Sequence, residues 1–502
     1  MQLLPILLVL APLSSSAPEP LSLDALFGLL ADKHPLFTKE TLKSDGERAA
    51  QRSHLGTQDW NLQARPTIAY SEPDASNPFA GDKAGTLGFE ASAERVLWST
   101  GGRFRANISS NYTHQRFAEI AESDTQLPPG TPDPSTLLPP GLENFVQLGV
   151  GVSYSHPLMQ NLGGTLDRLP FELSGFNIAR VELEAAENKE ALLLDIGLRY
   201  LDWVFLNEQQ KLMKARLKLA QRSLRLVLKR HKANLVDKVD VLRADDSVQI
   251  AKQSLVWTKA RSKAKQSELA VLTQEPKIYN QAPSYPLYEV HDLPDADSAI
   301  TSLKESSRLV QTLNTVRSQL ERQHAGIEET LEPQLFVTVG AGVTHDIAGY
   351  VDDTSENDLR PDVYALLNFQ YPLGNTTAEA DADGTRLKIM QVQEEVKEVE
   401  LSLEATARSL LIQLKDLQEV LRLNELQIKS AQRKTQEESK LYKRGRSMLT
   451  FVLQSQDGEQ SAKLARAETA ATYQKLFLQY QALTDALLKQ HQSTPAPPQE
   501  EP

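Results

Sequence analysis

The residues that come nearest to known site chemistry are the acidic run Glu379-x-Asp381-x-Asp383-Gly384. This spacing imitates the start of a calcium-binding loop, in which alternate carboxylates supply oxygen ligands. The glutamate that closes such a loop would fall at Met390, so we interpret the run as an exposed acidic first turn of a helix, where negative charge suits the helix dipole. The nine histidines form no metal-ligand spacing, and there is no credible nucleophile–base pair. The sequence therefore predicts no enzyme, no metal site and no cofactor.

Two other short stretches stand out because they interrupt long helical periodicity. Gly445 breaks a helical tract that runs from about residue 378 to 441 and resumes from about 452 to 488. A glycine followed by Ser or Thr and a fresh apolar period predicts the tip of a hairpin of two helices. The stretch from His231 to Ala244, around Asn234, has the same design. The chain is therefore expected to contain two long helical hairpins.

Composition excludes several classes of partner and chemistry. The 502 residues carry a net charge of -12, which argues against nucleic acid as a partner. There is no cysteine, so disulfides, thiolate metal sites, a cysteine nucleophile and a lipid anchor on cysteine are all excluded.

The N-terminus, residues 1–17, is predicted to be a signal peptide, with a short apolar core followed by Ser15-x-Ala17. Elsewhere no apolar run approaches the ~20 residues that a membrane helix needs. If the protein lies in a membrane, strands must place it there. The proline- and glutamate-rich tail, residues 491–502, is predicted to be disordered.

Period-two alternation predicts four strands, which lie at about 86–112, 147–154, 334–344 and 363–370. In the first of these, Phe104 and Ile108 fall on one side, whereas Arg103, Arg105 and Asn107 fall on the other. A water-soluble sheet with one polar face would show the same pattern. Four strands alone, however, make a poor free-standing domain with open edges.

The order of elements repeats once along the chain. Pro157 and Pro372 are 215 residues apart, and Asn234 and Gly445 are 211 apart. The first repeat spans 18–275, with a helix from about residue 21 to 64 that Arg65-Pro66 ends, a β-hairpin at about 86–156 and a helical hairpin at about 176–272. A proline-rich connector, 276–297, precedes the second repeat, 298–490, with a helix, a β-hairpin at about 334–371 and a helical hairpin at about 378–488. We therefore predict an α+β chain built by duplication.

A membrane barrel would remove the open edges and place the apolar face against lipid and the polar face in a hydrated lumen. Four strands are too few to close such a barrel, but three copies supply twelve. The pattern therefore predicts a trimeric twelve-stranded β-barrel, continued by a long α-helical coiled-coil barrel.

The layout resembles the TolC-type outer membrane efflux proteins over essentially the whole chain after the signal. The motifs that carry the resemblance are His34-Pro35-Leu36, Arg65-Pro66, Glu332-Pro333-Gln-Leu335, Ser155-His-Pro-Leu-Met-Gln-Asn-Leu-Gly163, Tyr371-Pro-Leu-Gly-Asn375, Val239-Asp-Val-Leu-Arg-Ala244 and the stretch Arg444–Gln456. The resemblance implies a homotrimer embedded in outer-membrane lipid, with its helical part in the periplasm. It also implies docking of the helical tips to a periplasmic adaptor protein and to an inner-membrane efflux pump or ABC transporter.

The resemblance further implies that the tips close the tunnel and that acidic residues there select for cations. Asp240 stands where the family often has an aspartate, but Phe451 replaces the second one and Gln454 follows where a further acid can occur. Phe451 is then either a hydrophobic gate or a residue packed between helices. Tyr442 matches a position that latches the closed state in relatives.

Both tips are basic, with Arg230, Lys232 and Lys238 in one and Lys443, Arg444 and Arg446 in the other. These charges are either simply solvated or functional, and the functional alternatives are salt-sensitive docking to an acidic adaptor tip or an electrostatic latch with Asp237, Asp240 or Asp245.

The leading interpretation is a passive export duct in the bacterial outer membrane. The alternative is a periplasmic coiled-coil scaffold or adaptor without a membrane barrel. The sequence names neither the exported substrate nor the class of pump.

Overall fold

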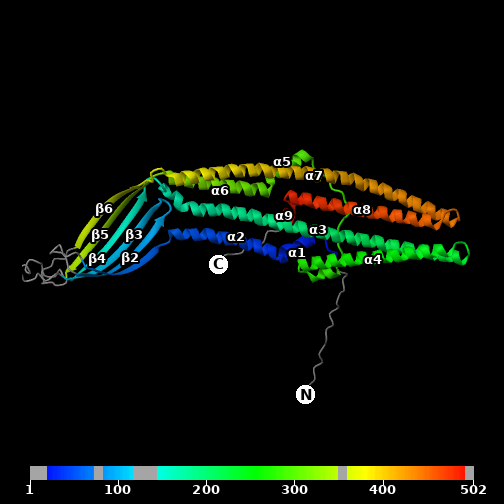
Figure 1. Ribbon diagram of the computed structural model, residues 1–502, viewed down its shortest axis with the longest axis horizontal. Helices are drawn as coiled ribbons and strands as arrows, with labels where there is room; N and C mark the ends of the chain where they lie inside the picture. Colours follow the sequence, from blue (N-terminus) through cyan, green and yellow to red (C-terminus); the bar gives the residue numbers. More distant parts are fainter. Residues whose placement is uncertain (1–19, 73–82, 117–143, 349–358, 492–502) are drawn as a thin grey trace, which may run out of the picture. The chain divides into compact units, whose positions relative to one another are not determined.

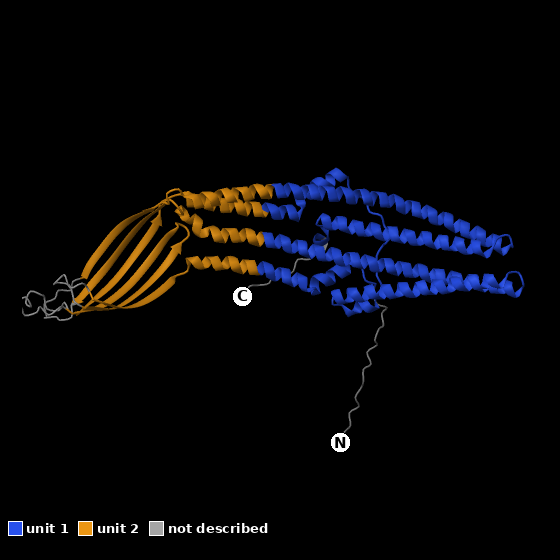
Figure 2. Ribbon diagram, in the orientation of Figure 1, with its two compact units in different colours: residues 1–45, 180–314, 394–502 blue, residues 46–179, 315–393 orange. Residues whose placement is uncertain are grey.

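The computed structural model describes residues 20–72, 83–116, 144–348 and 359–491. The expected signal peptide and the expected tail beyond His491 lie outside these ranges. The chain divides into two compact units (Figure 2). We call residues 1–45, 180–314 and 394–502 the helical unit, and residues 46–179 and 315–393 the sheet unit.

The elements follow one another along the chain as labelled in Figure 1. The helices are α1 (Leu23–Lys33), α2 (Pro35–His54), α3 (Thr165–Lys232), α4 (Lys238–Leu272), α5 (Ala296–Ser306), α6 (Arg308–Leu331), α7 (Thr376–Lys443), α8 (Leu449–Leu483) and α9 (Ala486–His491). The strands are β1 (Asn61–Ser71), β2 (Lys83–Leu97), β3 (Gly102–Arg116), β4 (Asn144–Pro157), β5 (Gln334–Ala348) and β6 (Leu359–Gln370).

In the described residues, the sheet has six antiparallel strands in the order β1-β2-β3-β4-β5-β6, so the prediction of four strands was wrong. The first helical segment ends at His54 instead of continuing to about residue 64, and Pro66 lies within the edge strand β1. An edge strand tolerates proline because one side of it needs no ladder hydrogen bonds. The segment expected as one strand at 86–112 is two strands, β2 and β3. They are joined by the turn Trp98–Gly101, where Gly101 has φ +69°.

The helical hairpins have the equal lengths expected of a duplication. Helices α3 and α7 each have 68 residues, and α4 and α8 each have 35. Helix α3 begins at residue 165 and α7 at 376, while α4 begins at 238 and α8 at 449, so both pairs are offset by 211. The first hairpin therefore begins eleven residues earlier than the predicted 176.

In the helical unit, α3 and α8 lie side by side between α4 and α7 (Figure 1). Arg216 of α3 pairs with Asp457 of α8 at 2.7 Å, and Asn424 of α7 donates a hydrogen bond to Thr469 of α8 at 3.0 Å. The largest core cluster includes Tyr200, whose buried hydroxyl donates to the carbonyl oxygens of Leu21 and Ser284. Burial raises the pKa of this tyrosine.

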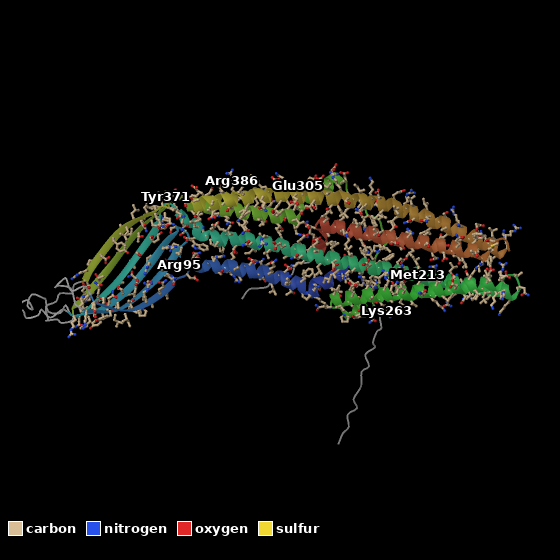
Figure 3. The ribbon with its side chains drawn as sticks, in the orientation of Figure 1. Arg95, Met213, Lys263, Glu305, Tyr371 and Arg386 are labelled. Atoms are coloured by element: carbon tan, nitrogen blue, oxygen red, sulfur yellow. The ribbon has the colours of Figure 1, made fainter. Side chains whose placement is uncertain are left out.

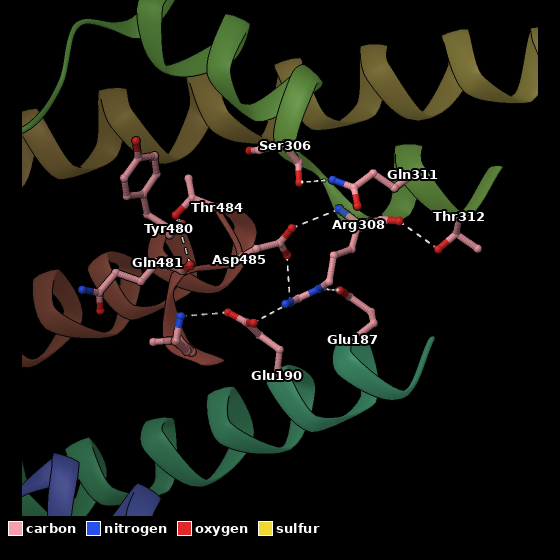
Figure 4. A network of polar contacts seen from close by, with 11 residues as sticks. Glu187, Glu190, Ser306, Arg308, Gln311, Thr312, Tyr480, Gln481, Thr484 and Asp485 are labelled. Carbon is pink, nitrogen blue, oxygen red and sulfur yellow. Dashed lines mark hydrogen bonds and ion pairs between the residues drawn. The ribbon is translucent and has the colours of Figure 1, made fainter. Parts of the chain in front are cut away.

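One guanidinium joins three segments of the helical unit (Figure 4). Arg308, at the start of α6, pairs with Glu190 and Glu187 of α3 and with Asp485, which lies between α8 and α9. The Arg308 side chain is only 11% exposed. Glu190 also accepts a hydrogen bond from the backbone N–H of Leu487 at 2.9 Å. This network ties the chain's last helical segment to α3 and α6.

Candidate functional site

The six-stranded sheet has one apolar face. Directly paired residues of neighbouring strands share a face, so the registers place Ile68, Leu87, Ile108, Val150 and Val343 together with many similar side chains. Between its ends this face is mostly apolar, with Ser110 and His345 as polar members. Several are strongly exposed, for example Ile68 at 84% and Val363 at 79%. Within the described part of the chain, nothing covers this apolar surface.

Among the described residues of the sheet, charges on the apolar face stand only at its two ends. Lys83 and Arg95 lie at opposite ends of β2, and Arg95 is labelled at the end of the sheet in Figure 3. The Arg95 guanidinium lies 6.0 Å from the centre of the Trp60 ring, and Trp60 packs edge-on against Phe104 at 5.9 Å. Arg95 comes twelve positions after Lys83, which is a distance of ~40 Å along a strand. At a strand tilt of about 40° this distance corresponds to a height of ~30 Å. This height equals the ~30 Å hydrocarbon core of a bilayer.

The opposite face of the sheet is polar, and the structure places the expected residues Arg103, Arg105 and Asn107 on it. Arg105 Nη2 lies 3.1 Å from Glu90 Oε1, and Arg103 Nη1 lies 4.0 Å from Glu94 Oε1. Glu90 and Glu94 were not among the residues predicted from the sequence. They lie four residues apart on one face of β2. This alternation could have been recognised in the sequence if β2 had been predicted as a separate strand.

Glycines of β4 lie beneath the polar side chains of β3. A Cβ atom on Gly151 would lie 2.9 Å from Asn107 Oδ1, and one on Gly149 would lie 2.6 Å from Ser109 Oγ. Only glycine leaves room for these side chains to lie across the neighbouring strand. On the polar face, β4 therefore has glycines without side chains at these two positions, whereas β2 and β3 carry charged side chains.

The two helical tips have the same backbone design, in the way the sequence predicted. Asn234 has φ +55° and Gly445 has φ +75°, and each ends a 68-residue helix. The N–H of the following residue bonds back to a carbonyl five residues earlier, from Leu235 to Arg230 and from Arg446 to Leu441, each at 2.9 Å. This is the Schellman arrangement, in which a left-handed residue closes the helix end.

The tips contact each other through Tyr442 and Arg230. The side chain of Tyr442 is buried in a cluster with Val227, Ala244 and Val452. Arg230 lies over the Tyr442 ring at 4.4 Å and donates a hydrogen bond to the Tyr442 carbonyl oxygen at 2.6 Å. The hydroxyl of Tyr442 has no hydrogen-bond partner among the described residues. Burial raises the pKa of Tyr442, and its ring is held by packing and by the cation above it.

The other predicted tip residues lie around this contact but do not join it. Arg444, Arg446 and Gln454 are exposed, and Asp240 pairs with Arg243 at 3.3 Å. Phe451 is 51% exposed in the first turn of α8, so it is not packed between helices of its own chain. The structure therefore brings Tyr442 to Arg230, leaves Asp240 partly buried near Tyr442, and leaves the remaining candidates exposed.

The outer helices of the helical unit carry exposed apolar side chains. On α4 these include Ile250, Val256 and Trp257, and on α7 they include Ile412 and Leu423. Because α4 and α7 flank α3 and α8 (Figure 1), exposed apolar side chains lie on both outer helices of this layer.

Within residues 20–491, leaving aside the gaps given above, no group of three or more His, Asp or Glu side chains is placed to hold a metal ion. Glu379, Asp381 and Asp383 are exposed in the first turns of α7. None of the described helices combines the length and the apolar character needed to cross a membrane.

Comparison of the structure with solved structures identifies its fold as that of TolC-type outer-membrane channel proteins. The outer-membrane channel OprN superposes with a TM-score of 0.64 at 12% identity, over 92% of this chain and 90% of that one. The outer membrane protein VceC of Vibrio cholerae gives 0.60 at 13% identity, over 93% and 95%. The open state of the MtrE channel of Neisseria gonorrhoeae gives 0.61 at 14% identity, over 93% and 89%. Sequence comparison with known families and with curated proteins finds no match.

Proposed function

We propose that the chain is one protomer of a passive exit duct in the bacterial outer membrane. The observation that carries this proposal is the sheet, which presents an uncovered apolar face ~30 Å high and an opposite face of paired charges. In a barrel, the apolar face contacts lipid and the polar face lines a hydrated lumen. On this proposal Arg103, Arg105 and Asn107 line the lumen.

Open edges in both units support closure with further copies. In the sheet, β1 and β6 are both edge strands, and they run in opposite directions because each neighbouring pair is antiparallel. In the helical layer, α4 and α7 are the outer helices, and both carry exposed apolar side chains. A cyclic assembly covers all four surfaces by joining one edge of each copy to the other edge of the next. We propose three copies, as the likeness to TolC-type channels suggests.

The helical tips are the proposed docking points for a periplasmic adaptor and an inner-membrane efflux pump or ABC transporter. Arg444 and Arg446 are exposed at one tip, and their charges suit a salt-sensitive contact with an acidic partner. Arg230 is already engaged with Tyr442, so it belongs to the contact between tips. Tyr442 and Phe451 are proposed to act at the gate.

A periplasmic scaffold without a barrel is the competing function. In that case the face containing Ile68 and Val363 would meet water, and two sheet edges would remain open to aggregation. The uncovered apolar face favours the duct.

Membrane fractionation tests the proposal. The full-length protein should fractionate with the outer membrane, migrate faster on gels before heating than after, and have the native mass of three copies. A protein recovered in the periplasmic fraction, with mobility independent of heating, would favour the scaffold.

A further inference from the structure

Among the residues that the structure describes, the first half of the chain contains a strand hairpin that has no counterpart in the second half. In the second half, β5 follows Pro333 and pairs directly with β6, which ends just before Tyr371-Pro372. In the first half, β1 carries Pro66 and β4 ends at Pro157, but β2 and β3 lie between them. Pro157 comes 91 residues after Pro66, whereas Pro372 comes 39 residues after Pro333. The strands β1 and β4 thus correspond to β5 and β6, and the β2–β3 hairpin is the addition.

The added hairpin is a full part of the sheet. Strand β2 pairs with β1 from Ala84 to Glu94, and β3 pairs with β4 from Arg103 to His114. Its turn is held within the sheet unit through Trp98, whose indole N–H donates to Thr57 at 2.9 Å. The guanidinium of Arg168 donates to the Trp98 carbonyl oxygen at 3.0 Å. A loosely attached flap would have neither these ladders nor this anchor.

Both faces of the hairpin continue the faces of the whole sheet. Leu87 and Ile108 extend the apolar face, while the ion pairs of Glu90 with Arg105 and of Glu94 with Arg103 extend the polar face. Inserting two antiparallel strands also keeps the flanking strands in their original directions. Strands β1 and β4 remain antiparallel to each other, just as β5 and β6 are. The insertion therefore leaves closure between β6 of one copy and β1 of the next unchanged.

We propose that the β2–β3 hairpin enlarges the barrel to eighteen strands in a ring of three copies and lines its lumen with the two ion pairs. This inference rests on the proposed duct and its three copies. Barrel diameter grows roughly linearly with strand number, so eighteen strands give an interior cross-section about twice that of twelve. The membrane part of the duct is then an open, water-filled pore comparable to a porin, and the helical tips set the limit on passage.

The first test is the strand count of the purified full-length assembly by electron cryomicroscopy. Eighteen strands, with Glu90 and Arg105 facing the lumen, are expected. A wall of twelve strands with the hairpin outside it, or a closed ring of two copies, overturns the inference but leaves a duct. The absence of any barrel overturns the proposed function itself.

Cysteine labelling provides a second test that does not need a deletion to fold. The chain has no cysteine, so Ser92→Cys on the polar face and Ala91→Cys on the apolar face are clean, adjacent reporters on β2. In intact cells a small membrane-impermeant maleimide should label Ser92→Cys and not Ala91→Cys. Labelling of both positions, or of neither, contradicts the placement of β2 in the barrel wall.

The pore width of the parent can then be compared with that of a variant that lacks the added hairpin and is expected to form a narrower barrel. Ser153→Cys on the polar face of β4 is placed in the parent chain and in a chain lacking residues 83–116. A small maleimide should label both assemblies, whereas a bulky polymer-linked maleimide should label the parent at least several-fold faster. Equal rates with the bulky reagent, in two assemblies that both show heat-dependent mobility, overturn the widening.

Discussion

The contact between Arg230 and Tyr442 is expected to hold the two tips together, and replacing Arg230 with methionine should release them. The change removes a charged hydrogen bond to the Tyr442 carbonyl oxygen, which contributes about 1.5–3 kcal/mol. It also removes the cation above the ring, which at a partly exposed site contributes about 0.5–1 kcal/mol. Methionine keeps an apolar stem of similar length, so packing changes little.

The combined loss of about 2–4 kcal/mol shifts an equilibrium between joined and separated tips by about 30-fold or more, at about 1.4 kcal/mol per tenfold. Single-channel recording in planar bilayers should therefore show a large rise in the open fraction for Arg230→Met. The matched control is Tyr442→Phe, which keeps the ring under Arg230 and removes a hydroxyl that has no partner among the described residues. This variant should gate like the parent.

Two results would refute this reasoning. If Arg230→Met conducts no more than the parent, the contact does not gate the duct. If Tyr442→Phe opens the channel as strongly as Arg230→Met, the Tyr442 hydroxyl holds the tips together. The contacts of Arg230 with the Tyr442 ring and carbonyl oxygen would then not be responsible.

Three further predictions concern the network, the gate and alkaline pH. Arg308→Met should lower the free energy of unfolding by roughly 3–5 kcal/mol, because it leaves buried carboxylates without their cation. Glu187→Gln should lower the free energy of unfolding far less in the same denaturant titration, because burial raises the pKa of Glu187 and so already disfavours its charged form. Equal losses in the two variants would contradict this prediction. Phe451→Ala should raise conductance with little change in melting temperature, whereas a large drop in melting temperature at unchanged conductance would place Phe451 between copies. Burial raises the pKa of Tyr285 to about 12 from 10.0, so the unfolded chain loses this proton first. The stability contribution is complete below pH 10 and lost between about pH 10 and 12. Melting curves of Tyr285→Phe should show a smaller alkaline loss than the parent, and an identical loss would contradict it.

The helical part of the fold was predictable because its signals are local. Apolar periodicity over many turns, a left-handed residue at Asn234 or Gly445 and a constant offset between the two hairpins each need only the sequence. The start of α3 was missed because its first turns contain Pro170, which suggests a loop.

The number of strands was not predicted correctly, although the length of the segment from Thr86 to Tyr112 is incompatible with one strand. A single strand from Thr86 to Tyr112 would have 27 residues and a length of ~90 Å, far beyond a membrane. That length requires a turn, and Gly101-Gly102 is its natural place. Alternation in β2 is weak because Ala91 and Ala93 carry little hydrophobic signal on the apolar face. Strand β1 was not predicted because the residues up to Arg65-Pro66 were interpreted as part of the first helix.

The tip residues were found as a group, but their contacts were not. Arg230 was grouped with the solvated or docking charges, and nothing in its neighbours along the chain indicates that it stacks on Tyr442, more than two hundred residues away. The Arg308 network was missed for the same reason, since the partners of Arg308 come from two distant segments, α3 and the residues between α8 and α9. Contacts of this kind depend on the tertiary arrangement of helices.

The most direct test of a duct is the conductance of the purified assembly with its tips removed. Residues 225–250 and 436–461, which correspond at the 211-residue offset, are each replaced by a short glycine linker. In planar lipid bilayers this variant should give large, discrete and stable conductance steps without a partner protein. Electrical silence from an assembly that still shows heat-dependent mobility would contradict the account.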